Sequence, residues 1–474
     1  MTRYSFLQVN VVHLISASVI LALPFLVSGC ASSGGALHYE WAPEKEVTGT
    51  ERATEHPSGN PPVAAAGQRE DQNGDEPDRL SDDAGLEEMV AFALERNPDV
   101  RRAFERWQGS LERAPQERAL PDPQLTYGYF VARTAERQGM MGRQRVSITQ
   151  MFPWFGTLDA RGGAAEERAH AEAYRLEAET NRIVAEIRKQ YAEYYYVEVA
   201  RGVFEEHRAI LAGLRDAIEA SYEAAVVDLV DILRIESELD RVTEQARSLD
   251  ERRKPVRAEL NRLLGRTAGA PLPEPLEWER FHPEDEELRD LARQIYRHPE
   301  MRARESELRG AEEAIRLAGN RSRPDFMVGA EVLERRDERT EGMLMFGMSL
   351  PVWRESYAAA RREARAERRE TAAGREALAL DLEARFAQAV FGLRDAERQL
   401  RLLDESLIPR AEATFEIIEG AYMEGETGFV ELTGAQRDLL DLREGRARAL
   451  ADQSQRFAEL LELAGHGAPQ TAGF

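Results

Sequence analysis

The 474-residue sequence has a single cysteine, few aromatic residues and no excess of positive charge. One cysteine, Cys30, excludes an intramolecular disulfide and any metal site built from several thiolates. Aromatic residues make up 7% of the chain and charged residues 31%, a composition typical of long exposed or coiled helices. The formal net charge of −23 repels phosphate groups and argues against a nucleic-acid partner.

Motifs of common enzyme sites are absent as well. The chain contains no G-x-S-x-G, no phosphate-binding glycine loop and no H-E-x-x-H. Its many acidic pairs suit the charged surfaces of helices, and its 8 histidines lack ligand spacing. We therefore expect no catalytic residues, no cofactor and no metal site.

Only the N-terminus carries a long apolar stretch, Val9–Val27, which ends in Val27-Ser28-Gly29-Cys30. Small residues before a cysteine fit cleavage by a signal peptidase. The string resembles a bacterial lipobox, which implies a lipoprotein signal peptide at residues 1–29 and acylation of Cys30. An ordinary secretory signal or an uncleaved anchor is the alternative.

Residues 30–85 are rich in Gly, Pro, Ser, Glu and Asp and predict a lipidated, disordered tether. Ala31 and Ser32 follow the cysteine in place of the aspartate that retains some lipoproteins in the inner membrane, which favours the outer membrane by analogy. No later segment has about 20 consecutive apolar residues. A mature chain that spans a membrane must therefore do so with strands.

An internal repeat of about 200 residues organises the rest of the chain. Four short motifs recur in the same order, at offsets of 201, 201, 198 and 200 residues. They begin at Asn97 and His298, Pro123 and Pro324, Phe152 and Leu350, and Tyr222 and Tyr422. We predict a first repeat at residues 86–283, a second at 284–466, and a tail at 467–474.

Each repeat predicts a short helix, a second helix that begins at a proline, two strands, a very long helix, a break and a medium helix. The expected short helices are Leu86–Arg96 and Glu287–Arg297, the second helices end near Ala119 and Asn320, and the long helices are Thr157–Tyr222 and Arg354–Tyr422. Each long helix would reach about 100 Å. After the first break, apolar residues at alternating steps of three and four predict a coiled-coil seam.

Period-two alternation of apolar and polar residues predicts strands at 124–133, 145–152, 325–333 and 343–350. This alternation is typical of transmembrane barrels, although half-buried soluble hairpins show it too. Four strands cannot enclose a channel, and lipid tolerates no open sheet edge. If these strands span a membrane, the chain must oligomerise, and three copies would supply twelve strands.

This order of elements, occurring twice in an exported chain, resembles the TolC-type outer-membrane efflux proteins from Leu86 to Gly465. The resemblance implies a mainly α fold with a transmembrane β-barrel: long coiled α-hairpins, four β-strands per protomer, a trimeric twelve-stranded barrel and a helical periplasmic tunnel. It implies a homotrimer in the lipids of the cell outer membrane that passively conducts solutes as the exit duct of an efflux or secretion system. The partners would be a periplasmic adaptor (membrane fusion) protein and an inner-membrane efflux pump.

A lipid-anchored periplasmic adaptor without a pore is the alternative. Such proteins have one helical hairpin and glycine-rich β domains, whereas this chain predicts two hairpins and no further β domain. The cargo is not indicated, because neither methionine nor histidine residues form a cluster in the sequence.

The most specific local match is the turn between helices at the tunnel entrance. The family pattern, Tyr-x-x-Gly with an acidic residue six positions later, is met by Tyr422, Gly425 and Glu431. The first copy has Ala225 in place of the glycine, and Thr427 replaces a basic residue found in some members, so a gate salt bridge of that kind is not expected. The resemblance implies an entrance formed by Tyr222, Asp228, Asp231, Tyr422, Glu424, Gly425, Glu426 and Glu431. Rings of carboxylates would favour cations, unless these are ordinary solvated turn residues.

Overall fold

The computed structural model describes residues 80–81, 83–133, 140–223, 228–276, 278, 280–335 and 341–466. All of them belong to one compact unit, residues 60–474, which is described here by itself. The predicted signal peptide, Cys30, nearly all of the tether, Ala225 and the tail lie outside the described residues. The boundaries of the two repeats stay a prediction.

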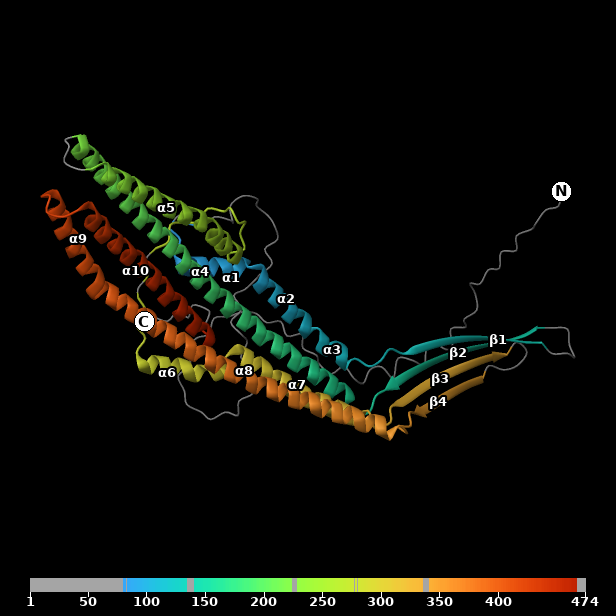
Figure 1. Cartoon of the computed structure of the whole chain (residues 1–474). Coiled ribbons are helices and arrows are strands. Elements are labelled where there is room, and N and C mark those ends of the chain that lie inside the picture. The colour runs from blue at the N-terminus through green and yellow to red at the C-terminus, as the bar shows by residue number, and fades with distance from the viewer. Residues whose placement is uncertain are drawn as a thin grey trace, which may run out of the picture. The chain divides into compact units, whose positions relative to one another are not determined.

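The described elements are mainly helices, with four antiparallel strands (Figure 1). The first repeat contains α1 (Leu86–Arg96), α2 (Pro98–Leu111), α3 (Arg113–Arg118), β1 (Gln124–Arg133), β2 (Met140–Phe152), α4 (Thr157–Glu223) and α5 (Leu229–Leu263). The second contains α6 (Asp285–Gln294), the 3-10 turn η2 (Ile295–Arg297), α7 (Pro299–Asn320), β3 (Phe326–Arg335), β4 (Glu341–Met348), α8 (Arg354–Leu402), the π-helical segment η3 (Leu403–Leu407), α9 (Ile408–Met423) and α10 (Phe429–Leu463).

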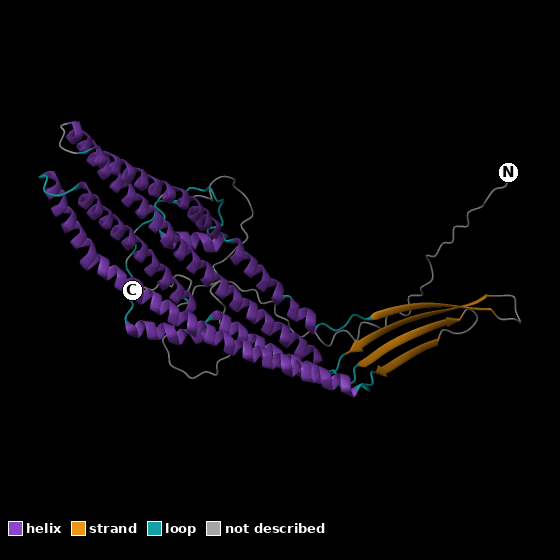
Figure 2. Ribbon diagram, in the orientation of Figure 1, coloured by secondary structure: helices purple, strands orange, loops and turns teal. Residues whose placement is uncertain are grey.

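The strands form one sheet in the order β1-β2-β3-β4, and all three pairings are antiparallel (Figure 2). The central pairing joins β2 of the first repeat to β3 of the second. β2 begins five residues before the predicted position 145, β3 extends to Arg335, and β4 lies two residues earlier than predicted. The backbone ladder continues past the apolar alternation, because its hydrogen bonds do not depend on the side chains.

The helix α4 spans 67 residues without interruption, as predicted. It packs against α5 along one part of its length and against α2 and α3 along another. The second helix of the first repeat was expected to run to Ala119, but α2 ends at Leu111 and α3 follows. Pro115 explains this break, since it has no N–H to donate to the carbonyl of Leu111.

The prediction of one uninterrupted helix from Arg354 to Tyr422 is wrong. The chain passes from α8 through the π-helical η3 into α9, which has Pro409 in its first turn. Pro409 cannot donate to the carbonyl of Glu405, and a π-helical turn accommodates the missing bond. Asp404 within η3 accepts hydrogen bonds from Arg280 and Arg446, both at 2.6 Å.

A buried polar residue precedes the proline of α2 and of α7. Asn97 accepts hydrogen bonds from the backbone N–H groups of Asp99 and Val100, and its amide donates to the carbonyl of Leu263 at 2.7 Å. At the corresponding position His298 accepts from the backbone N–H of Glu300 at 3.2 Å. Both helices therefore begin with a side-chain cap and a proline, a combination that suits a helix start.

The largest apolar core lies between α1, α4, α5 and the first two thirds of α10, and a second lies between α6, α8 and the end of α10. The connector after α5 is anchored to α4 by two buried tyrosines. The hydroxyl of Tyr194 donates to the carbonyl of Pro273 at 3.1 Å, and that of Tyr191 to the carbonyl of Leu276 at 3.3 Å.

Among the residues described, none of the helices combines the length and the apolar composition needed to cross a membrane.

Candidate functional site

The candidate site lies at the tips of two helical hairpins, α4–α5 and α9–α10. Because α4 follows β2 directly and α8 follows β4, these long helices carry both tips far from the sheet (Figure 1). The hairpins also contact each other, through α4 and α10. The residues that the sequence predicts as an entrance are therefore gathered at one end of the helices.

The second tip is a glycine-dependent turn. Gly425 has φ +76°, a left-handed conformation that residues with a Cβ rarely adopt. The N–H of Glu426 donates to the carbonyl of Ala421 at 2.8 Å, and the N–H of Gly425 donates to that of Tyr422 at 3.0 Å. These bonds satisfy the last carbonyls of α9 and end the helix. The glycine of the motif thus sets the sharp turn into α10.

Tyr422 connects this turn to the other hairpin. Its ring packs edge-on against Phe429, with centroids 6.5 Å apart, and contacts the main core. Burial raises the pKa of the Tyr422 hydroxyl, and the negative charge of Asp231 raises it further. The structure therefore brings together Tyr422 and Asp231, which the sequence places in different repeats.

The first tip is described only on its two flanks. Tyr222 is 44% exposed, in contrast to its partly buried counterpart Tyr422. Asp228 precedes α5, and its carbonyl accepts a hydrogen bond from the N–H of Asp231 at 3.0 Å. The carboxylate of Asp231 forms an ion pair with Arg234 at 3.5 Å. Asp231 is thus paired within its own helix.

The acidic residues of the second tip differ in their surroundings. Glu424 and Glu426 are exposed in the turn itself. Glu431, in the first turn of α10, folds back over Gly428, where a Cβ would lie 2.8 Å from its carboxylate oxygen. Gly428 therefore leaves room for Glu431 to approach the start of the helix, a place that favours negative charge.

A buried charge network, which the sequence analysis missed, links α4, α5 and α10. Glu238 is 8% exposed, forms an ion pair with Arg437 at 2.8 Å and also bonds Arg241. Burial alone would raise the pKa of the Glu238 carboxyl, but the hydrogen bonds from Arg437 and Arg241 outweigh it and lower this pKa. The nearby His207 is buried too, and desolvation lowers the pKa of its imidazole. A glutamate beside the apolar seam of α5 is the signal that could have indicated this network.

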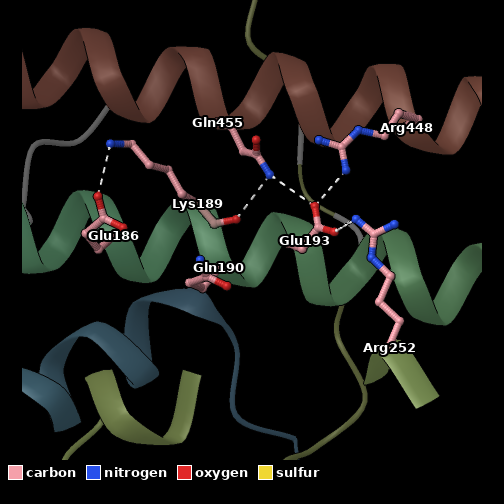
Figure 3. A pocket seen from close by; sticks show the side chains of 7 residues that line it. All are labelled: Glu186, Lys189, Gln190, Glu193, Arg252, Arg448 and Gln455. Carbon is pink, nitrogen blue, oxygen red and sulfur yellow. Dashed lines mark hydrogen bonds and ion pairs between the residues drawn. The ribbon is translucent and has the colours of Figure 1, made fainter. Parts of the chain in front are cut away.

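A second set of charges lines a groove of about 550 Å³ between α4, α5 and α10 (Figure 3). Glu193 of α4 lies between Arg252 of α5, at 2.6 Å, and Arg448 of α10, at 2.7 Å. Next to them, burial and a hydrogen bond to Glu444 raise the pKa of Tyr196 to about 12. The ion pairs that line this groove therefore join α4 to α5 within one hairpin and to α10 of the other.

Within the part of the chain that the structure describes, histidine, aspartate and glutamate side chains form no group that could hold a metal ion.

The comparisons with known proteins bear on this architecture. The family model of the outer membrane efflux proteins matches residues 291–466, which run from within α6 to just past the end of α10. These residues belong to the outer membrane efflux protein family. The family that the repeat, the strands and the entrance motif indicated is thereby confirmed, and the predicted function as an outer-membrane efflux protein agrees with it. No curated protein matches the chain.

Solved structures extend the likeness of the fold to most of the length of this chain. VceC from Vibrio cholerae has a TM-score of 0.69 at 16% identity, covering 81% of this chain and 96% of its own. The MtrE outer membrane channel of Neisseria gonorrhoeae has 0.68 at 17%, covering 82% and 91%. The CmeC outer membrane channel of Campylobacter jejuni has 0.70 at 12%, covering 91% and 96%. These matches confirm the predicted mainly helical fold with a few antiparallel strands and give no support to a periplasmic adaptor without a pore.

Proposed function

We propose that this outer membrane efflux protein is the outer-membrane channel of a tripartite efflux or secretion system and conducts solutes passively. The observation that carries this function is the sheet. On one face of it most side chains are apolar and many are exposed, among them Tyr127 at 62%, Leu344 at 74% and Phe346 at 79%. So large an apolar surface in a folded chain suits contact with lipid.

The edges of the sheet support a homotrimer. β1 and β4 each pair with one neighbour among the described strands, so each leaves a row of backbone groups open. Lipid supplies no partner for such groups. Three copies, joined β4 to β1, would close a twelve-stranded barrel wide enough for solutes.

The junction between strands and helices suits the boundary of a membrane. Phe155 is 79% exposed and Trp353 is 74% exposed, directly after β2 and β4. Trp and Tyr are enriched at the level of the lipid head groups, because their rings are apolar and carry one polar group, so Trp353 suits this level. The helices beyond this junction would then lie in the periplasm.

An apolar stripe along α8 supports contacts between copies. Leu380, Phe391 and Leu402 are 61%, 67% and 53% exposed and lie at steps of eleven residues. Eleven residues make close to three full turns, so the three side chains share one face of the helix. In a trimer this face would pack against a helix of the neighbouring protomer.

The tips would meet the partners. At the start of α5, Leu229, Val230 and Leu233 are 53%, 52% and 54% exposed. Exposed apolar residues beside acidic ones suit a protein interface. We infer that a periplasmic adaptor binds here and connects the channel to an inner-membrane pump.

Conductance in a planar bilayer tests the channel and its entrance together. Full-length protein is expected to form cation-selective pores, because Asp231 and Glu431 of each copy contribute negative charge at the narrow end. The double variant Asp231→Asn with Glu431→Gln is expected to lose about half of the selectivity, measured as a reversal-potential shift in a salt gradient.

The matched control is Glu244→Gln, an exposed acidic residue of α5 that lies thirteen residues past Asp231 and so away from the tip, and it should leave selectivity unchanged. Unaltered selectivity in the double variant would show that Asp231 and Glu431 do not set the ion selectivity of the entrance, while the channel function would still stand. A folded protein that forms no pores would contradict the channel itself.

For the N-terminus we propose a lipid anchor at Cys30 in the outer membrane, based on the Val27-Ser28-Gly29-Cys30 string. In cells fed an alkyne-tagged palmitate, the wild-type chain is expected to be labelled and Cys30→Ala to be unlabelled. Labelling that persists in Cys30→Ala, or a wild-type chain without label, would contradict the anchor.

A further inference from the structure

The face of the sheet opposite the apolar one carries polar, small and methionine side chains. The register of the strands is continuous, so residues that face each other across it share a face. Row by row from the helix-proximal end, this second face carries Met151, Met327 and Gly347, then Thr149, Gly329 and Met345, then Ser147, Glu331 and Met343.

Four methionines therefore gather on adjacent strands. Met151 lies directly opposite Met327. The methyl carbon of Met327 lies 3.0 Å from the position that a Cβ at Gly347 would take, and that of Met345 lies 3.2 Å from the same position at Gly329. Two of the side chains thus extend across the glycines of the neighbouring strand. Met343 precedes Met345 by two residues in β4 and so lies on the same face.

These methionine side chains are exposed to solvent, and methionine is the main apolar residue type on this face. Met151, Met327 and Met343 are 46%, 37% and 51% exposed. Among the side chains described on this face, Leu333 is the one other apolar residue. The opposite face instead uses mainly Leu, Ile, Val, Phe and Tyr, with Gln144 and Gln150 in β2 and Met348 in β4. Among the described side chains, four methionines lie on this face and one, Met348, on the opposite face, a bias that a general need for apolar contact would not produce.

The thioether supplies a property that the other apolar side chains lack. Its sulfur is polarisable and neutral, and soft sulfur ligands select Cu(I) over hard cations. The nearest carboxylate, Glu331, is buried and pairs with Arg145 at 2.8 Å, so it offers little to a hard cation. Neighbouring strands place opposite residues within reach of one shared ligand.

We propose that the methionine face, defined as Met151, Met327, Met343 and Met345, binds soft monovalent cations of the Cu(I) and Ag(I) type. This inference rests on the proposed function in one respect: in a barrel whose apolar face meets lipid, the methionine face lines the pore. A weak thioether site there would let such cations, as cargo, pass from one site to the next, since conduction needs several sites of moderate affinity.

Binding of Ag(I) to the purified full-length protein tests the site, because Ag(I) needs no reductant. Any free Cys30 thiol is first blocked with N-ethylmaleimide, and nitrate salts replace chloride, which precipitates silver. The variant Met327→Leu with Met343→Leu and Met345→Leu keeps the volume and apolar character of the side chains. We expect its affinity for Ag(I) to fall on the order of tenfold or more by calorimetry.

Met348→Leu is the matched control, because Met348 lies in the same strand on the opposite face, opposite Phe326. It should bind Ag(I) like the wild type. Ag(I) should also protect Met327, Met343 and Met345 from oxidation by peroxide, mapped by mass spectrometry, and leave Met348 unprotected. Equal affinity in the wild type and the triple variant, or no protection of the three methionines, would overturn the proposal.

Pore conductance of the same proteins separates this proposal from the channel function. Micromolar Ag(I) is expected to reduce the current through wild-type and Met348→Leu pores and not through the triple variant. Pores whose current and Ag(I) binding do not depend on the three methionines would overturn the site and leave the channel. Ag(I) binding at the methionines in a protein without pores would contradict the channel and leave the site.

Discussion

Ile148→Arg is expected to abolish membrane-inserted trimers. Ile148 lies in the central strand β2 on the apolar face and is 45% exposed. If this face meets lipid, each copy would place a guanidinium in the hydrocarbon layer, at a cost of about 2–4 kcal/mol per side chain near the midplane. Three copies in one barrel multiply this cost. Native mass spectrometry of extracted membranes should show the trimer reduced at least tenfold.

The adjacent residue provides the control. Ser147 lies in the same strand, next to Ile148, but its side chain belongs to the opposite face, which would line the aqueous pore. Ser147→Arg should therefore insert and assemble like the wild type. If Ile148→Arg assembled as well as Ser147→Arg, the apolar face would not be the lipid-facing side, and the orientation proposed for the methionine face would be wrong too.

Arg437→Ala is expected to lower the free energy of unfolding by about 3 kcal/mol, because it leaves the buried Glu238 with one of its two arginine partners. The pair joins α10 to α5, so the loss should also loosen the contact between the hairpins. The measurement is urea unfolding followed by far-ultraviolet circular dichroism. Replacing Glu238 as well, in Arg437→Ala with Glu238→Met, should recover most of the loss by removing the uncompensated charge.

Arg443→Ala is the comparison for this change. Arg443 lies on the same helix and pairs with Glu412 at 3.0 Å, but its side chain is 35% exposed and that of Glu412 44%. A solvent-exposed pair contributes about 1 kcal/mol or less. Equal destabilisation by Arg437→Ala and Arg443→Ala would show that burial of Glu238 does not set the strength of the network.

Local sequence patterns determined the order and type of the elements. The absence of proline over 66 residues predicts α4, period-two alternation predicts all four strands, and Gly425 marks the turn that the structure closes with a left-handed residue. Each of these signals acts within a few residues of the chain, and so the sequence alone carries it. The misjudged breaks, at Pro115 and Pro409, also had a local cause that the sequence contains.

Tertiary structure decided which residues meet across the repeats. The pairing of β2 with β3, the approach of Asp231 to Tyr422 and the ion pair between Glu238 and Arg437 join residues about 175 to 200 positions apart. The methionines are scattered in the sequence, and only the strand register collects them on one face. Periodicity states which side of a strand a residue takes, but its neighbour on the next strand depends on a register set by contacts far along the chain.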